Sequence, residues 1–490
     1  MAGTIRLEKL GKPGVFLVAE GFLDDAKHAT VDYGMTPLRL VYVPGYVWGQ
    51  PSEEKQPLGD ASIDEIVDAL IRPLSTEEQK PKQLERETYP PIEFTAESYG
   101  AAVEKFNHFF LDKQWGDGLA LLPPTPERVK WMLTGTSRSP GEIIGKVDPK
   151  GGFATIEKIA INAMMAGAKP EYLPVIIAAM EGFTDPNMDL RHPVLSMGSF
   201  TFAIIVSGPI AEEINMNSGI GFFGHGWRAN ATIGRALRLC LTNMGYTFPI
   251  MNDMARLGRQ SPYTFYALAE NGESSPWQPY HVSQGYKPGD SCVTVSTVSS
   301  YHMGGAFNNQ PCSGNTGESA LDAIIKSVLS QRQAFFAQYK RGVANLGSLP
   351  AKYLFLITPE MANKLKQLGY NQENLIDYIY KTTSIPYEEL TSEEKRGIKD
   401  FIDTSIAGEG ILGLRLPQDR IPVFQEAFKP GGKVPLIVTP EDIHIIVIGF
   451  GSGGGVLGGV YQLSFGKALY KPTSHQTKLI TGATLTKAGR

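Results

Sequence analysis

The chain is predicted to be a multi-domain α/β protein, with a small N-terminal parallel-sheet domain and two larger α/β lobes. Its 490 residues exceed what a single hydrophobic core holds. Short apolar runs alternate with helical segments of about 10 to 15 residues, a pattern typical of parallel sheets with crossover helices. The charged stretch from Ser75 to Pro91 almost lacks aliphatic side chains and indicates a linker. The expected domains are therefore residues 1–75, 93–345 and 346–490, with a linker at 76–92.

The first elements are expected to be a strand, a helix and a second strand over residues 14–44, completed by a helix from Ser62 to Leu74. After the linker we expect a helix from Ala96 to Phe110, then a strand within residues 117–122 that leads to a helix started by proline. The next segment carries many polar residues that packing does not require. It predicts helices at 155–166 and 170–180, a strand at 202–207 and a helix beginning near Asn230 or Ala231.

The rest of the chain predicts further strands separated by amphipathic helices, at residues 291–300, 352–358 and 443–448. Thr316 and Glu318 supply polar start signals for the first of these helices. The glycine-rich segment 449–460 lacks the spacing of a dinucleotide or Walker loop, which favours a loop packed at a domain interface. His444, inside the preceding strand, is interpreted as a buried core residue.

Composition and charge limit the classes of function. Hydrophobic residues make up 42% of the chain and charged residues 20%, as in ordinary globular proteins. The net charge of −4 favours neither nucleic acid nor an anionic membrane as a partner. There is no apolar run of about 18 residues and no secretory signal, and three cysteines do not make a disulfide framework. We therefore expect a cytoplasmic protein without a membrane or nucleic-acid partner.

The sharpest local motif is GFFGHGWRANATIGRA, at residues 221–236. Its glycines permit unusual backbone dihedrals, and Asn230 is a plausible N-cap for a helix that includes Thr232. The first amides of that helix and the Arg228 guanidinium would attract a carboxylate or phosphate. The alternative is a tight structural turn whose arginine pairs with a nearby acidic residue.

Other residues around this motif are candidates for acid–base or polar roles. His225 is interpreted as a general base, a metal ligand or a packed loop residue, although no metal-ligand spacing surrounds it. Glu157 and Asn162 lie on or beside the apolar stripe of a helix, so they either point into a cleft or belong to a solvated face. Asn215 and Asn217 precede the glycines and are further candidates for substrate binding.

The cysteines are candidate reactive groups, because a thiolate is a nucleophile. Cys312 lies in the loop NNQPCSGNTG before a helix start, where its pKa could be lowered, but an inert thiol is the alternative. Cys240 lies on an apolar helix face and is interpreted as a core residue.

Two motifs, AINAMMAGAKPEYLPVIIAAM and GFFGHGWRANATIGRALRL, resemble the group of proteins that accompany the UGSC-type domain, named for a Cys/Sec-Gly-Ser-Cys motif. Residues 13–72 resemble the later part of that small α/β domain. The redox motif itself should precede Lys12, and the chain has no cysteine there. The resemblance implies that a second subunit carries the motif, or that this member has lost redox chemistry.

These observations predict a substrate-binding or catalytic subunit of a thiol- or selenol-linked oxidoreductase that acts on a small anionic metabolite. One alternative is a redox-independent lyase or hydrolase of a small carboxylate or phosphate compound. Another is a non-catalytic binding or scaffold subunit. We expect an oligomer, with a catalytic His225 or Glu157; the sequence assigns no cofactor and no metal. The predicted substrate-binding residues are Arg228, Asn230, Asn162, Asn215, Asn217 and Thr232, with Cys312 as a possible thiol.

Overall fold

The protein is of mixed α/β type and divides into two compact units. Unit 1 comprises residues 1–120, 145–154 and 240–254, and unit 2 comprises 121–144, 155–239 and 255–490. The structure is a computed structural model. It describes residues 2–19, 22–32, 35–43, 52–80, 91–249, 252–253, 255, 257–303, 317–330, 332, 350–407, 416–449, 460–466 and 473–484.

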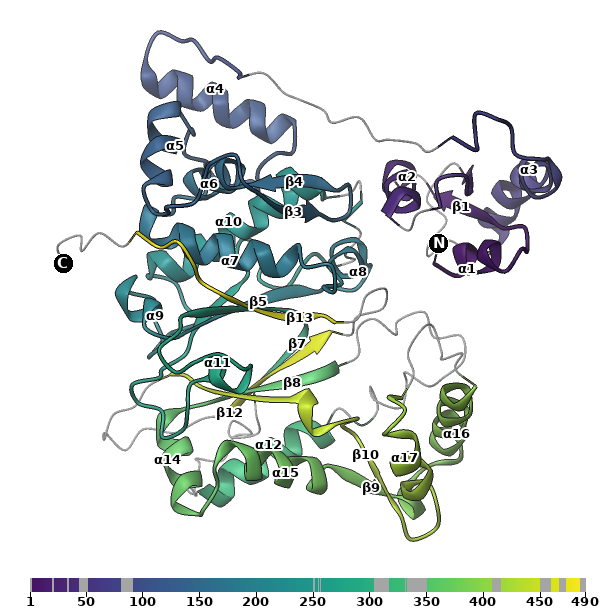
Figure 1. Ribbon diagram of the computed structural model, residues 1–490, viewed down its shortest axis with the longest axis vertical. Helices are drawn as coiled ribbons and strands as arrows, with labels where there is room; N and C mark the ends of the chain where they lie inside the picture. The colour runs from purple at the N-terminus through teal and green to yellow at the C-terminus, as the bar shows by residue number, and fades with distance from the viewer. Residues whose placement is uncertain are drawn as a thin grey trace. The chain divides into compact units, whose positions relative to one another are not determined.

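Unit 1 contains the predicted parallel strand pair, β1 (Val15–Ala19) and β2 (Arg39–Val43), joined by α2 (Leu23–Asp32). This confirms the strand–helix–strand prediction. The following helix begins ten residues earlier than expected, because α3 spans Ser52–Ile71. The unit also contains α1 (Ala2–Lys9) and α4 (Tyr99–Asp112) (Figure 1). Residues 81–90 of the predicted linker lie outside the described part of the chain.

The strand predicted within residues 117–122 is absent, since this segment has neither helical nor strand geometry. The helix started by proline does follow, as α5 (Pro126–Leu133). The hairpin of β3 (Ile143–Val147) and β4 (Gly152–Thr155) leads to α6 (Ile156–Met165). Thr155 caps α6 by accepting a hydrogen bond from the Lys158 amide at 3.2 Å, close to the predicted start.

The centre of unit 2 is one mixed sheet with the strand order β11-β8-β12-β7-β5-β6, and β13 pairs with part of β7. β5 and β6 run parallel, as do β8 and β11, whereas β12 is antiparallel to both β7 and β8. This sheet contains strands from both sides of the domain boundary predicted near residue 346. The two predicted large lobes therefore share one sheet. The strands are β5 (Thr201–Ser207), β6 (Tyr266–Ala269), β7 (Cys292–Met303), β8 (Pro350–Ile357), β11 (Ile443–Val447), β12 (Val460–Gly466) and β13 (His475–Leu479).

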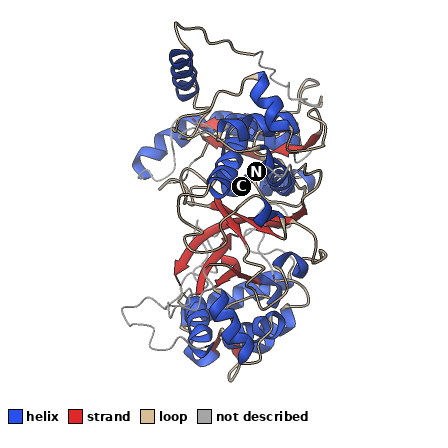
Figure 2. Ribbon diagram, turned by 90° about the vertical axis from the view of Figure 1, so that its left-hand side faces the viewer, coloured by secondary structure: helices blue, strands red, loops and turns tan. Residues whose placement is uncertain are grey.

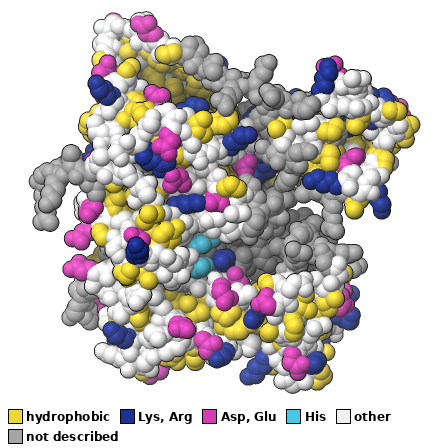
Figure 3. All heavy atoms as spheres, in the orientation of Figure 1, with side chains coloured by type: hydrophobic (Ala, Val, Ile, Leu, Met, Phe, Trp, Pro, Cys, Tyr) yellow, Lys and Arg dark blue, Asp and Glu magenta, His cyan; other side chains and the backbone are white. Residues whose placement is uncertain are grey.

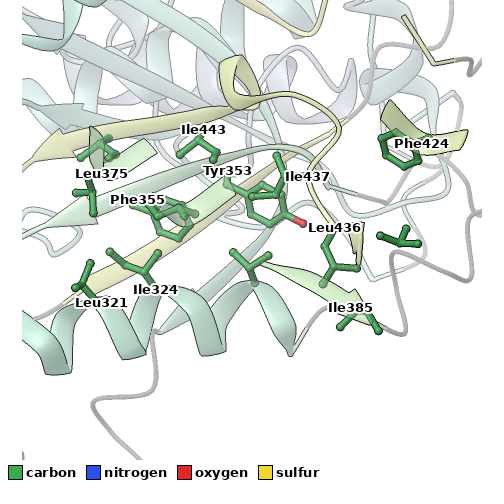
Figure 4. Packing of buried hydrophobic residues seen from close by; sticks show 14 of the residues in the cluster. Leu321, Ile324, Tyr353, Phe355, Leu375, Ile385, Phe424, Leu436, Ile437 and Ile443 are labelled. Carbon is green, nitrogen blue, oxygen red and sulfur yellow. The ribbon is translucent and has the colours of Figure 1, made fainter. Parts of the chain in front are cut away.

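Helices cover the outer face of this sheet. α7 (Leu173–Phe183) packs on β7 and β13, and a Cβ added to Gly182 would lie 2.6 Å from Cγ2 of Val295. α12, α14 and α15 cover β8, β11 and β12, where alternate strand residues such as Tyr353, Phe355 and Ile443 form a core (Figure 4). The remaining elements are α8 (Arg191–Leu195), α9 (Ile210–Glu213), α10 (Arg228–Gly245), α11 (Tyr280–Ser283), α12 (Gly317–Leu329), α14 (Pro359–Gln367), α15 (Gln372–Thr382), β9 (Ser384–Pro386), α16 (Ser392–Ile406), α17 (Ile421–Ala427) and β10 (Lys433–Pro435).

The sheet is strongly curled, so that its two ends approach each other. Asn271, two residues after β6, donates its backbone N–H to the Val447 carbonyl of β11 at 2.8 Å. Its side chain donates to the Gly449 carbonyl at 3.1 Å. β6 and β11 stand at opposite ends of the strand order, so these bonds require the curvature that is visible in the twisted strands of Figure 2.

The curled sheet therefore has an inner face as well as the helix-covered outer face. Paired residues of neighbouring strands point to the same side, and side chains alternate along each strand. An apolar layer from six strands lies on the inner side and includes Ala203, Leu354 and Ile446. His444 pairs with Leu354, and His475 pairs with Ser296, which pairs in turn with Ala203. Both histidines therefore lie on the inner face.

Among the helices in the described ranges, none has the length and apolar character needed to cross a membrane.

Candidate functional sites on the inner face of the sheet

The glycine- and asparagine-rich loop is held by two buried asparagines, Asn217 and Asn230. The Asn217 amide donates to Oδ1 of Asn230 at 2.8 Å, and Nδ2 of Asn230 donates to the carbonyls of Asn217 and Ala267, each at 3.1 Å. The Asn217 side chain in turn bonds Ile220 and Gly219. These side chains connect the loop to α10 and β6. These hydrogen bonds hold the loop against α10 and β6.

The start of α10 differs from the predicted N-cap arrangement. The helix begins at Arg228, so Asn230 lies within the first turn and is not the predicted N-cap. Nε of the exposed Arg228 donates to the Gly167 carbonyl at 2.9 Å. The Thr232 hydroxyl donates to the Arg228 carbonyl at 2.7 Å. These groups mainly stabilise local structure, because the polar sequence pattern of a helix start also serves to satisfy backbone groups.

The other predicted residues are placed apart from one another. Glu157 is exposed on α6, and Asn162 is buried there, with Nδ2 bonded to the Lys158 carbonyl at 2.9 Å. Asn215 is exposed and has a positive φ of 54°, as the turn after α9 requires. His225 is exposed and lines a pocket. Cys312 lies outside the described residues.

The pocket beside His225 has a volume of about 430 Å³, within the range of about 300–1,000 Å³ for small-molecule sites. Phe223 lines the pocket, and its ring centroid lies 5.4 Å from those of both Tyr266 and Tyr301 in edge-to-face geometry. The lining residues are Phe222, Phe223, Gly224, His225, Asn230, Ala231, Ser261, Thr264, Phe265, Tyr266, Ala267 and Tyr301. Of the predicted site residues, the structure thus brings His225 and Asn230 to one cavity.

A second constellation on the inner face was not predicted. The hydroxyl of buried Tyr280, at the start of α11, lies 3.1 Å from Nδ1 of His444 and 3.1 Å from Nε2 of His475. The two imidazole rings stack with centroids 4.7 Å apart and an interplanar angle of 21°. A phenol has one proton, so Tyr280 donates to one imidazole and accepts from the other. The three side chains therefore form a continuous hydrogen-bonded chain.

The environment keeps both imidazoles neutral. Burial lowers the pKa of His444 well below its usual value, and repulsion from His475 when that imidazole is protonated and from the Lys352 charge lowers it further. Burial and the Lys352 charge lower the pKa of His475 to about 3. Burial also raises the pKa of Tyr280 well above its usual value. Lys352 lies two residues before Leu354 on β8, so its side chain also points to the inner face of the sheet. Lys352 is the positively charged residue of this group.

Glu270 completes the group on the opposite side of Tyr280. Both of its carboxyl oxygens lie 2.9 Å from the Tyr280 amide, which donates to them, and only 7% of the residue is exposed. Burial raises its pKa to about 7, although the Tyr280 amide and the Ser207 hydroxyl act in the opposite direction. A carboxyl group with this pKa exchanges its proton near neutral pH.

His475 and Lys352 lie on the side of the group nearest to solvent, although Nδ1 of His475 is itself buried. His475 is partly exposed, and the Lys352 side chain is 26% exposed, with Nζ 4.0 Å from Oδ1 of Asp442. Figure 3 shows histidine atoms at the surface of the molecule beside a basic side chain. Groups with strongly perturbed pKa values that reach solvent together are typical of catalytic sites.

Thiol and metal chemistry gain no support from the described residues. The Cys240 thiol is buried and its pKa is raised, and burial with the nearby Asp290 charge raises the pKa of Cys292 to about 12. Neither is a thiolate at neutral pH. Within the ranges that the structure describes, no three His, Cys, Asp or Glu side chains are grouped to hold a metal ion.

Comparison with protein families, with curated proteins and with solved structures found no match. The one sequence signal for the second constellation was a histidine inside an apolar strand, His444, which was interpreted as a core residue. Tyr280 is 164 residues from His444 and 195 residues from His475 in the chain, so no motif spacing links the three residues.

Proposed function

We propose that the protein is an acid–base enzyme of the lyase or hydrolase class that acts on a small anionic metabolite. The observation that carries the proposal is the Tyr280 hydroxyl, which joins two neutral imidazoles at 3.1 Å each. When His475 takes up a proton, its Nε2 can give a proton to the Tyr280 oxygen while the Tyr280 hydroxyl proton moves to Nδ1 of His444. The positive charge then passes from His475 to His444, and the reverse transfer returns the proton to His475. Such a chain supports general acid–base catalysis at the His475 end.

Lys352 favours an anionic substrate. Its charge is one cause of the low pKa of both histidines, so it lies close enough to act on a ligand beside His475. A bound carboxylate or phosphate would offset that charge and raise the pKa of His475. Substrate binding thus makes His475 a stronger base at the step where a proton is removed. Glu270, with a pKa of about 7, is the group that can exchange a proton at neutral pH.

The test is turnover of metabolites by the purified full-length chain. A deproteinised metabolite extract is incubated with the protein, and anionic compounds are followed by mass spectrometry. We expect one anionic compound to be consumed, with the rate falling by about 10²–10⁴-fold in His475→Gln. His108→Gln is the matched control, because His108 is an exposed histidine on α4. Equal turnover by wild type and His475→Gln would contradict the proposal.

A subunit role is a second candidate function, and the N-terminal sheet favours it. In the described part of the chain, β1 and β2 form a two-stranded sheet. Such a sheet is marginal in isolation, and Leu17 of β1 is 48% exposed. A second polypeptide, such as the expected Cys-Gly-Ser-Cys subunit, would cover this sheet by adding structure at its edge. This second proposal includes the predicted three-domain layout and a role as a subunit of a thiol- or selenol-linked oxidoreductase.

Native mass spectrometry of the protein purified from its source tests the subunit role. A second chain with a Cys-Gly-Ser-Cys or selenocysteine motif would support it. A homo-oligomer of this chain alone, active in the metabolite assay, would leave the acid–base enzyme as the better account.

A further inference from the structure

The pocket beside His225 is separate from the acid–base group in its lining residues, and its chemistry is different. No Lys, Arg, Asp or Glu occurs among the described residues that line it. Arg238 lies behind one wall, with its guanidinium 4.7 Å from the centroid of Phe265 and Nη2 bonded to the Ser261 carbonyl at 3.0 Å. The pocket therefore has no charge that would select an anion or a cation.

Aromatic rings define its shape. Phe222 and Phe223 have centroids 4.6 Å apart, and the edge-to-face contacts of Phe223 place Tyr266 and Tyr301 on the same wall. Phe223 is 37% exposed and Tyr301 36% exposed, so both rings present surface to the cavity or to solvent. Exposed aromatic faces of this kind stack on planar rings.

Polar groups occur at the edges of the pocket. The Ser261 and Tyr266 hydroxyls make no hydrogen bond within the described part of the chain, and burial raises the pKa of Tyr266. His225 is exposed at the same pocket, and Thr264 keeps acceptor capacity because its hydroxyl donates to the Ala231 carbonyl at 3.1 Å. Hydrogen-bonding groups around aromatic faces match a flat ligand with polar edges. A quaternary ammonium ion could not use them.

We propose that this pocket binds a neutral planar heteroaromatic group of nucleobase size, with its face against Phe223 and Tyr301 and its polar edge toward Tyr266 and Ser261. The volume accommodates a one- or two-ring heterocycle with room for a substituent. The inference does not depend on the proposed acid–base activity, because none of its residues belongs to that group.

The test is saturation-transfer NMR and calorimetry with the full-length chain, with adenine, uracil and nicotinamide as probes. Tetramethylammonium and inorganic phosphate are the competing ligand classes. We expect at least one heterocycle to bind and its dissociation constant to rise at least fivefold in Phe223→Leu and in Tyr301→Leu. Tyr99→Leu is the matched control, since Tyr99 is 63% exposed on α4, and it should leave binding unchanged.

A further variant separates stacking from hydrogen bonding. Tyr266→Phe keeps the ring and should weaken the heterocycle while leaving the binding of toluene unchanged. Binding of tetramethylammonium in place of the heterocycles would overturn the proposal in favour of a cation cage. Binding of no probe, or equal affinity in wild type, Phe223→Leu and Tyr301→Leu, would also overturn it.

Discussion

Glu270→Gln replaces the one carboxyl group in the inner-face group with an uncharged isostere. Burial raises the pKa of Glu270 from its usual 4.5 to about 7, so the folded protein holds this proton more tightly than the unfolded chain does. The stability that this provides is fully present below pH 4.5 and is lost as the pH rises toward 7. A difference of about 2.5 in pKa corresponds to on the order of 3 kcal/mol. Glutamine resembles the protonated form and does not ionise.

The Glu270→Gln variant is therefore expected to have the same free energy of unfolding as the wild type near pH 4. At pH 8 its free energy of unfolding should be higher by on the order of 3 kcal/mol. Urea denaturation across this pH range measures the difference, and infrared spectroscopy of the protonated carboxyl group reports its titration directly. Glu273→Gln is the control, because Glu273 is exposed three residues away. The reasoning is refuted if wild type and Glu270→Gln show the same pH dependence, or if the carboxyl group titrates near 4.5.

Three other substitutions test the remaining geometry. His475→Gln should shift acid unfolding to lower pH, because a folded-state pKa of about 3, below the usual 6.5, gives stability that is lost as the pH falls from 6.5 toward 3. Acid titration followed by circular dichroism would show no shift if His475 were an ordinary exposed histidine. Asn230→Ala removes three hydrogen bonds and should lower the free energy of unfolding, measured in urea, by about 2–3 kcal/mol. Asn215→Gly, at an exposed residue with positive φ, should be nearly neutral, and equal effects would contradict a structural role for the Asn230 hydrogen bonds. Gly234→Ala would place a Cβ 2.5 Å from the Phe265 carbonyl oxygen and should lower the free energy of unfolding by about 3 kcal/mol. Gly100→Ala is the control, because its added Cβ would contact only the Ser98 side chain, at 3.9 Å. A Gly234→Ala variant as stable as the wild type would contradict the prediction.

Local features of the fold were predictable because their causes are local. The start of α6 was predicted to within a residue from Thr155, and α5 begins at a proline, Pro126, as expected. Capping and proline geometry depend only on neighbouring residues, so the sequence shows them directly. Apolar runs gave β5, β8 and β11 for the same reason. The strand predicted within residues 117–122 was wrong, because an apolar segment can form either a strand or an extended coil. Only pairing with another strand distinguishes the two.

The candidate site could be predicted only in part. The motif at residues 221–236 did lead to the pocket through His225, and the N-cap role predicted for Asn230 was wrong, because α10 begins at Arg228. Anion binding by Arg228 and Asn230 stays a prediction. The same residue types that bind an anion also satisfy backbone groups in a tight loop, and the sequence does not say which use is made of them. Whether Cys312 is reactive stays a prediction.

The sequence by itself determined that the chain alternates helices and strands and where most of them begin. Tertiary structure alone decided that Glu270, Tyr280, His444 and His475 meet. Their meeting depends on strand register, which sets the face of each side chain, and on the curl that brings β6 to β11. Both are results of packing between segments far apart in the chain, and no local pattern of residues encodes them.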